Sequence, residues 1–142
     1  MTMTLEAAWE LSRGDSGLAI VSTLRADQTI QASLVNTGIV KGDLAFVTYG
    51  PVKLANLRAR PQLTVTFRDG WQWAAVEGRA ELIGPDDPRD GVDAEGLRLL
   101  LREIFTAAGG THDDWDAYDR TMVEQRRTAV FVTPTRVYSN AS

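Results

Sequence analysis

Between two strand-like runs the chain reads Tyr49-Gly50-Pro51-Val52-Lys53-Leu54-Ala55-Asn56-Leu57-Arg58-Ala59-Arg60-Pro61. Gly50 is an acceptable helix N-cap, and Pro51 suits the first helical position, where its missing N–H costs nothing. Pro61 stops the helix, because a proline disfavours the helical conformation at the residue before it. The stretch predicts a short helix whose first turn carries Lys53 and free backbone donors, an arrangement that favours binding of a phosphate.

The same region is cationic in an acidic protein. Residues 44–68 contain no Asp or Glu but four basic residues, Lys53, Arg58, Arg60 and Arg68, in a chain whose net charge is −4. The window is therefore +4 and the remainder of the chain −8. Such a carboxylate-free window indicates an anion site, although a solvated helix face that only aids solubility would carry the same charges.

The composition is that of one ordinary globular domain over residues 1–142. Its apolar runs are too short for a membrane span and its N-terminus lacks a signal pattern, so a cytoplasmic protein without membrane contacts is expected. The absence of cysteine from the sequence excludes disulfides, thiolate metal sites and a cysteine nucleophile. A pI near 4.9 argues against nucleic acid as a partner.

Six segments have the composition of β-strands. They are residues 17–24, 29–37, 44–48, 62–68, 71–83 and 129–138. Asp69-Gly70, between the fourth and fifth segments, is a strong hairpin signal. Gly78 is expected to mark a bulge in the fifth segment, and Pro134 an edge or bulged position in the last.

Three further segments are expected to be helical. Thr4 caps a short helix at 5–13, and apolar residues at helical spacing from Leu97 to Ala108 give a second helix, ended by Gly109-Gly110. A capping box of Thr111 and Asp114 begins a third. Strands in hairpin order with few helices between them predict a mainly β fold, a six-stranded antiparallel barrel whose helices fill a gap or cover an open end.

No residue pattern indicates a catalytic or metal site. His112 is the only histidine, and the acids around it are better explained as the first turn of a helix than as metal ligands. Nucleophile elbow, catalytic triad and P-loop patterns are all missing from the sequence, so an enzyme would take its reactivity from a cofactor. A planar, phosphate-bearing cofactor fits the basic helix start and a strand face with Trp71 and Trp73, although core packing explains each tryptophan alone somewhat better.

Several of these segments together resemble the pyridoxamine 5′-phosphate oxidase-like split β-barrel proteins. They resemble most closely the branch of flavin/deazaflavin oxidoreductases whose mycobacterial members bind the deazaflavin coenzyme F420. The most specific match is the Lys-x-x-Asn-Leu-x-x-x-Pro pattern from Lys53 to Pro61. Looser matches lie at residues 31–36, 44–48, 65–67 and 132–137, so that the resemblance covers nearly the whole chain and implies a split barrel.

The resemblance also implies a homodimer with two cofactor sites at the subunit interface, each built from both chains. The cofactor-binding residues that it implies are Gln31, Ser33, Val35, Thr48, Gly50, Pro51, Val52, Lys53, Asn56, Arg58, Arg60, Trp73, Arg136 and Tyr138. Lys53 and the backbone around Gly50 would meet the phosphate, Asn56 would brace the loop or the ribityl chain, and residues 31–35 would line the ring. Trp73, Arg136 and Tyr138 would be wall residues, donated across the dimer.

Charge favours F420 over FMN as the cofactor. F420 carries a phosphodiester and an anionic oligoglutamate tail, so it needs cations beyond one lysine, and Arg58 and Arg60 are expected to supply them. The strand at 31–36 offers no cation, which argues against pyridoxamine phosphate as a substrate. The resulting hypotheses are an F420-dependent reductase that transfers a hydride to a small conjugated acceptor (biliverdin-, quinone- or enone-like), an FMN-dependent oxidoreductase, and a non-catalytic F420 carrier.

Overall fold

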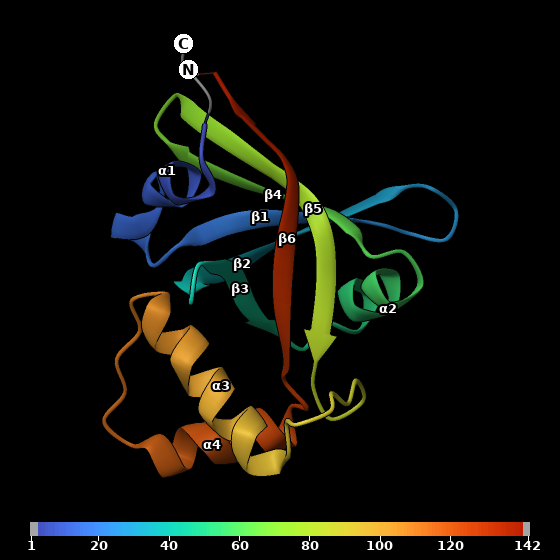
Figure 1. Cartoon of the computed structure of the whole chain (residues 1–142), viewed down its shortest axis with the longest axis vertical. Coiled ribbons are helices and arrows are strands. Elements are labelled where there is room, and N and C mark those ends of the chain that lie inside the picture. The colour runs from blue at the N-terminus through green and yellow to red at the C-terminus, as the bar shows by residue number, and fades with distance from the viewer. Residues whose placement is uncertain (1–2, 141–142) are drawn as a thin grey trace.

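Within residues 3–140, which this computed structural model describes, six antiparallel strands close into a barrel in the order β1-β2-β3-β6-β5-β4 (Figure 1). The strands are β1 (Leu18–Leu24), β2 (Ile30–Val40), β3 (Asp43–Thr48), β4 (Gln62–Asp69), β5 (Gln72–Ile83) and β6 (Thr128–Ser139). The predicted fold class, a six-stranded antiparallel barrel with flanking helices, is confirmed.

The barrel interior is filled by alternate side chains of every strand. Cross-strand partners such as Val21 on β1 and Val65 on β4 point inward together, and both are fully buried. Phe46 and Phe67 are the largest fully buried side chains of this core. Because side chains alternate along a strand, the intervening residues face the outside of the barrel, where helices cover only part of the surface.

The predicted hairpin turn at Asp69-Gly70 and the predicted bulge at Gly78 are both confirmed. Asp69 pairs with Gln72, which leaves Gly70, with φ of 61°, and Trp71 as a two-residue turn. The prediction that Trp71 shares a strand face with Trp73 is therefore wrong, and Trp71 is 95% exposed. The register of β5 against β6 shifts between Glu77 and Gly78, as expected for a bulge.

Gly78 is required there because the backbone of β6 passes very close. A Cβ at this position would lie 2.4 Å from the carbonyl oxygen of Thr133. Pro134 pairs with Gly78, and β6 continues through the proline as one strand. The barrel is closed, so Pro134 occupies a bulged position and not an edge.

Gly38 shows why β2 is longer than predicted. The sequence placed a connection at 38–43, but the turn consists of Lys41 and Gly42, both with positive φ, and Gly38 lies within β2. A Cβ on Gly38 would come within 2.7 Å of the Ala107 backbone, so this glycine lets a helix lie directly on the strand.

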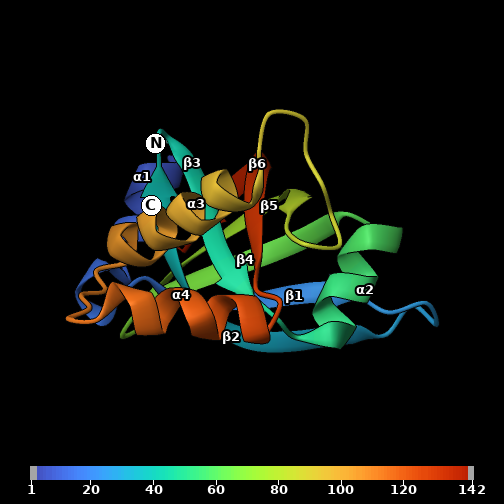
Figure 2. The same ribbon diagram turned by 90° about the horizontal axis from the view of Figure 1, so that it is seen from below.

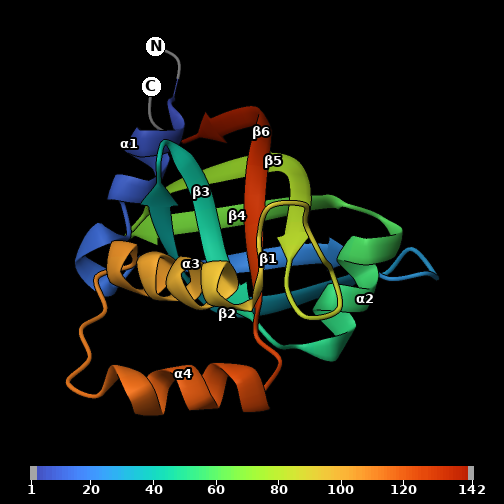
Figure 3. The same cartoon turned by 60° about the horizontal axis from the view of Figure 1, so that its bottom comes forward.

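In the described part of the chain four α-helices flank the barrel: α1 (Leu5–Glu10), α2 (Pro51–Ala59), α3 (Ala94–Ala107) and α4 (Trp115–Glu124). In Figures 2 and 3, α3 lies across β2 and β3, α4 runs beyond it, and α2 sits at another part of the barrel near β1. The α3–α4 pair is joined by Tyr118 Oη, which donates to the Leu101 carbonyl at 3.1 Å, and by ion pairs of Arg98 and Arg102 with Asp119. No helix in the described part of the chain is long and apolar enough to span a membrane.

The end of α1 and the start of α4 differ from the predictions. α1 ends at Glu10 and a short 3₁₀ turn follows at Arg13–Asp15, so the helix predicted at 5–13 is too long. The predicted Thr111 cap is also wrong. Asp114 is the N-cap of α4, and its carboxylate accepts from the Ala117 N–H at 3.0 Å. The Asp114 N–H, which the capping box assigned to Thr111, donates to His112 Nδ1 instead.

Candidate functional site

Lys53 is a buried lysine without an acidic partner. It lies in the first turn of α2, is 5% exposed, and its Nζ donates to Thr48 Oγ1 at the end of β3, at 3.0 Å. Nζ also lies 6.0 Å from the centre of the Phe46 ring. No ion pair of Lys53 is present within residues 3–140. Burial lowers the pKa of Lys53, and the positive charge of Arg127 lowers it further.

The start of α2 adds backbone donors beside this lysine. Gly50 is the N-cap and provides no side-chain cap, and Pro51 has no N–H to satisfy. The N–H groups of Val52 and Lys53 have no partner within the helix, since helical bonds begin with the Leu54 N–H, which donates to the Gly50 carbonyl. The predicted Gly50–Lys53 segment is thus an N-terminus with free donors and a cation, which suits an anion.

Sequence reasoning missed Arg127, which lies just before β6. Thr48 pairs with Thr128, and the Arg127 guanidinium carbon lies 3.8 Å from the centre of the Tyr49 ring. Its Nε donates to Gln125 Oε1 at 2.8 Å, and burial lowers the pKa of Arg127. The only available signal was the basic pair preceding the last strand, which does not reveal that β6 pairs with β3.

Asn56 and Gln31 are brought together through a third polar residue. Asn56 Nδ2 donates to Thr23 Oγ1 at 3.0 Å, and Thr23 Oγ1 donates to Gln31 Oε1 at 3.3 Å. Ser33 and Val35 share the inward face of β2 with Gln31. Val35 belongs to the barrel core, whereas Ser33 Oγ is buried and has no hydrogen-bond partner in the described structure.

Arg58 and Arg60 are both engaged by groups of the protein. Arg58 forms a bidentate pair with Asp87, with Nε 2.9 Å from Oδ1 and Nη2 2.7 Å from Oδ2, which holds the loop after β5 against α2. Arg60 Nε donates to the Leu24 carbonyl at 3.0 Å. Within residues 3–140, Arg58 is thus paired with an acid, whereas Lys53, Arg60 and Arg127 have no acidic partner and donate to neutral groups.

Trp73, Arg136 and Tyr138 form a separate group on the outer face of β5 and β6. The Trp73 and Tyr138 rings meet edge to face at 6.0 Å, and Arg136 pairs across the strands with Glu77. In Figure 1 the start of β5 and the end of β6 lie at the top of the barrel, whereas α2 lies lower and to the right. A single chain therefore does not bring these three side chains to Lys53.

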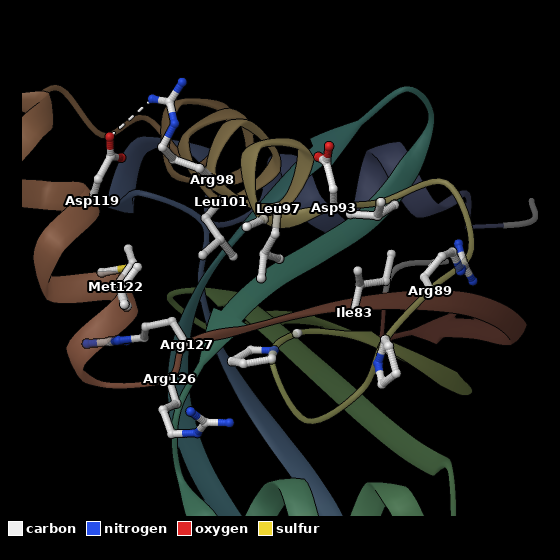
Figure 4. Close-up of a pocket in the computed structure, with 16 residues that line it drawn as sticks. Ile83, Arg89, Asp93, Leu97, Arg98, Leu101, Asp119, Met122, Arg126 and Arg127 are labelled. Carbon is white, nitrogen blue, oxygen red and sulfur yellow. Dashed lines mark hydrogen bonds and ion pairs between the residues drawn. The ribbon is translucent and has the colours of Figure 1, made fainter.

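A cavity of about 350 Å³ lies between α3, α4 and the loop after β5 (Figure 4). Apolar side chains make most of its wall: Ile83, Pro85, Pro88, Val92, Leu97, Leu101, Met122 and Val123. The charged residues at its rim are largely paired, Arg98 with Asp119 and Arg126 with Asp86. Arg127 also borders the cavity, and Figure 4 shows its guanidinium directed away from Leu97.

His112 is part of an aromatic cluster rather than of a polar site. Its Nδ1 accepts from the Asp114 N–H at 3.0 Å, and its ring packs against Phe105, Trp115 and Tyr118. Trp115 lies in the same cluster. This cluster joins α4 to α3, and its Phe105 and Tyr118 line a second pocket together with Arg127.

The structure is similar to several solved protein structures. No family model matches the sequence. The conserved hypothetical protein Rv2991 from Mycobacterium tuberculosis aligns with 98% of this chain and 85% of its own, with a TM-score of 0.71 and 17% identity. A protein named F420 reductase aligns over 97% and 98% of the two chains, with a TM-score of 0.66 and 19% identity. A putative pyridoxamine 5′-phosphate oxidase from Listeria innocua covers 88% and 89%, with a TM-score of 0.55 and 12% identity.

At these identities the similarity concerns the fold. It extends over 98% of this chain for Rv2991 and 97% for the F420 reductase. The chain described here thus has the split β-barrel fold of pyridoxamine 5′-phosphate oxidase-like proteins.

Proposed function

We propose that this chain is an F420-dependent reductase that transfers a hydride to a small conjugated acceptor. The observation that carries the proposal is the buried Lys53 ammonium, which has no acidic partner among the described residues and lies beside the free N–H groups of α2. A buried charge without a counterion is costly, and an anionic ligand supplies that counterion. The F420 reductase of similar fold makes this cofactor class the first to test.

The residues present fit a phosphate-bearing deazaflavin at two points. Lys53 and the N–H groups of Val52 and Lys53 would hold the phosphate, and the unpartnered Ser33 Oγ is a buried polar atom available to a ligand. Asn56 keeps α2 in place through Thr23. The deazaflavin would supply the hydride, and the protein would contribute orientation and exclusion of water rather than a nucleophile.

We infer that the working unit is a homodimer. A continuous row of side chains crosses five strands on the outer face of the barrel, in register from β2 to β6: Leu34, Ile20, Thr66, Ala75 and Tyr138. Leu34 is 64% exposed and Ile20 43%, and Trp73 lies next to the row with 38% exposure. An apolar patch of this kind on a sheet is typical of a protein interface. Pairing through this face would let Trp73, Arg136 and Tyr138 of one chain reach the site of the other.

We assign the acceptor to the cavity between α3 and α4, because its apolar wall suits an uncharged conjugated molecule and Arg127 joins it to the Lys53 region. Replacing Leu97 with tryptophan should fill the cavity and lower kcat/KM for the acceptor by about tenfold or more, with cofactor affinity unchanged. Leu99→Trp is the matched control, since Leu99 lies on the same helix but is 49% exposed and does not line this cavity. Equal kcat/KM values for the two variants would show that the acceptor does not bind in this cavity.

FMN is the second candidate cofactor, and the structure provides a reason to consider it. Arg58 and Arg60, expected to meet the oligoglutamate tail, are bound to Asp87 and to the Leu24 carbonyl. FMN has no such tail and needs fewer cations.

A fluorescence titration of the purified protein with F420 and with FMN tests the choice. Binding of F420 in the micromolar range or tighter, with weaker FMN binding, supports the proposal, and preference for FMN replaces it with the FMN-dependent function. Oxidation of the reduced cofactor by a panel of quinones and enones then distinguishes a reductase from a carrier, which would bind F420 without turnover.

A further inference from the structure

We propose that Arg127 is the second cation of the Lys53 site, and that the two together bind a phosphate-bearing ligand with at least two negative charges. The inference rests on the proposed function in that it concerns the same site. It adds a residue from the opposite end of the sequence and a requirement on the charge of the ligand.

The first support is geometric. Lys53 Nζ is hydrogen-bonded to Thr48, and the Arg127 guanidinium is stacked on the ring of the next residue, Tyr49. Pairing of β3 with β6 brings this about, because Thr48 and Thr128 are cross-strand partners and Arg127 immediately precedes Thr128. The two cations thus flank one dipeptide, directly before the N-terminus of α2.

The second support is that the described residues provide no acidic partner for either cation. Arg58 and Arg126 are paired with Asp87 and Asp86, whereas Arg127 donates from Nε to the neutral Gln125 side chain. Lys53 donates to a neutral hydroxyl. Burial lowers the pKa of both groups, because it disfavours their charged forms. The two groups also carry the same charge, so a bound anion would offset both their mutual repulsion and the cost of burying them.

The chemistry of the donors defines the ligand class. An ammonium, a guanidinium and backbone N–H groups at a helix start are the groups that recognise phosphate oxygens. Two cations match the dianion of a phosphate monoester, as in FMN, or a phosphodiester followed by a carboxylate, as in F420. Riboflavin and the phosphate-free deazaflavin precursor of F420 share the ring systems but lack these charges, and they therefore isolate the anionic part of binding.

The experiment compares these four ligands with the wild-type chain and with two variants. Arg127→Gln is expected to weaken binding of the phosphate-bearing partner of each pair by about 10- to 100-fold, the effect of losing one charge-assisted hydrogen bond, and to leave the phosphate-free partner unchanged. Arg127→Lys, which keeps the charge, should recover part of the loss. Arg126→Gln is the matched control: it removes a neighbouring arginine that is paired with Asp86, and Figure 4 shows its guanidinium pointing in a different direction.

The outcomes separate the two proposals. If the wild-type chain binds the ligands but Arg127→Gln weakens all four equally, or none, the role of Arg127 is overturned while the proposed function stands. If the wild-type chain binds none of the four, the proposed function fails, and pyrophosphate then tests the two-cation site alone. A rise in melting temperature with pyrophosphate that Arg127→Gln loses and Arg126→Gln keeps supports the site, and an equal rise in all three proteins, or no rise, excludes it.

Discussion

Replacing Lys53 with methionine is expected to weaken cofactor binding by about 1.5–3 kcal/mol and, at the same time, to stabilise the empty protein. The loss in binding is that of one charge-assisted hydrogen bond to the phosphate. The gain in stability has a different origin. The wild-type ammonium is 5% exposed and has no acidic partner in the described structure, so an unbranched apolar side chain in its place removes a desolvation penalty of about 1–3 kcal/mol.

The pH dependence of stability provides a second measure of the same residue. The folded-state pKa of Lys53 lies below its unfolded value because of burial and the charge of Arg127. Between the two pKa values the unfolded chain binds more protons, so the free energy of unfolding of the empty protein should rise with pH through that interval. The rise should stop near the ordinary lysine pKa of about 10.4, and Lys53→Met should lack this contribution.

Denaturant unfolding at several pH values and cofactor titration of both proteins check the two effects. Lys53→Arg is the control, because it keeps the charge and should retain part of the affinity without the gain in stability. A methionine variant that is less stable than the wild type, with unchanged affinity, would show that Lys53 is a structural residue of the barrel end.

Replacing Leu34 with glutamate is the second variant with a large expected effect. Leu34 is 64% exposed in the single chain and is the cross-strand partner of Ile20 in the apolar row across the barrel. If this face pairs two chains, each dimer would bury two unpaired carboxylates, at a cost of several kcal/mol. The variant should be a monomer at micromolar concentration, with its cofactor binding largely lost because each site then lacks the wall from the partner.

Light scattering coupled to size-exclusion chromatography measures the oligomeric state. Leu99→Glu is the matched control, since Leu99 is an exposed leucine of α3 outside the apolar row and its replacement should leave a dimer. A monomeric wild-type protein, or a Leu34→Glu dimer, would exclude this face as the dimer interface.

Local chemistry explains which parts of the fold were predictable from sequence. The Asp69-Gly70 turn, the Gly78 bulge and the Pro51–Pro61 limits of α2 each follow from conformational preferences within a few residues. The errors arose where tertiary packing determines the outcome. Gly38 reads as a turn residue in sequence, but it lies in β2 because α3 comes too close for any side chain.

The same distinction between local sequence signals and tertiary packing applies to the candidate site. Lys53 was identifiable because the helix signal and the charge window are local, and its burial against Thr48 is consistent with a specific role. Arg127 was missed because only the pairing of β3 with β6 places it near Tyr49. The cavity between α3 and α4 depends on how two helices and a loop lie relative to the barrel, which no periodicity in the sequence specifies. Likewise, the pairing of Arg58 with Asp87 requires the position of the loop after β5.

A crystal structure of the protein with bound F420 would locate the cofactor phosphate. We expect a dimer in which phosphate oxygens lie within hydrogen-bonding distance of Lys53 Nζ and of the first N–H groups of α2. A phosphate located elsewhere, with Lys53 still bonded only to Thr48, would contradict it.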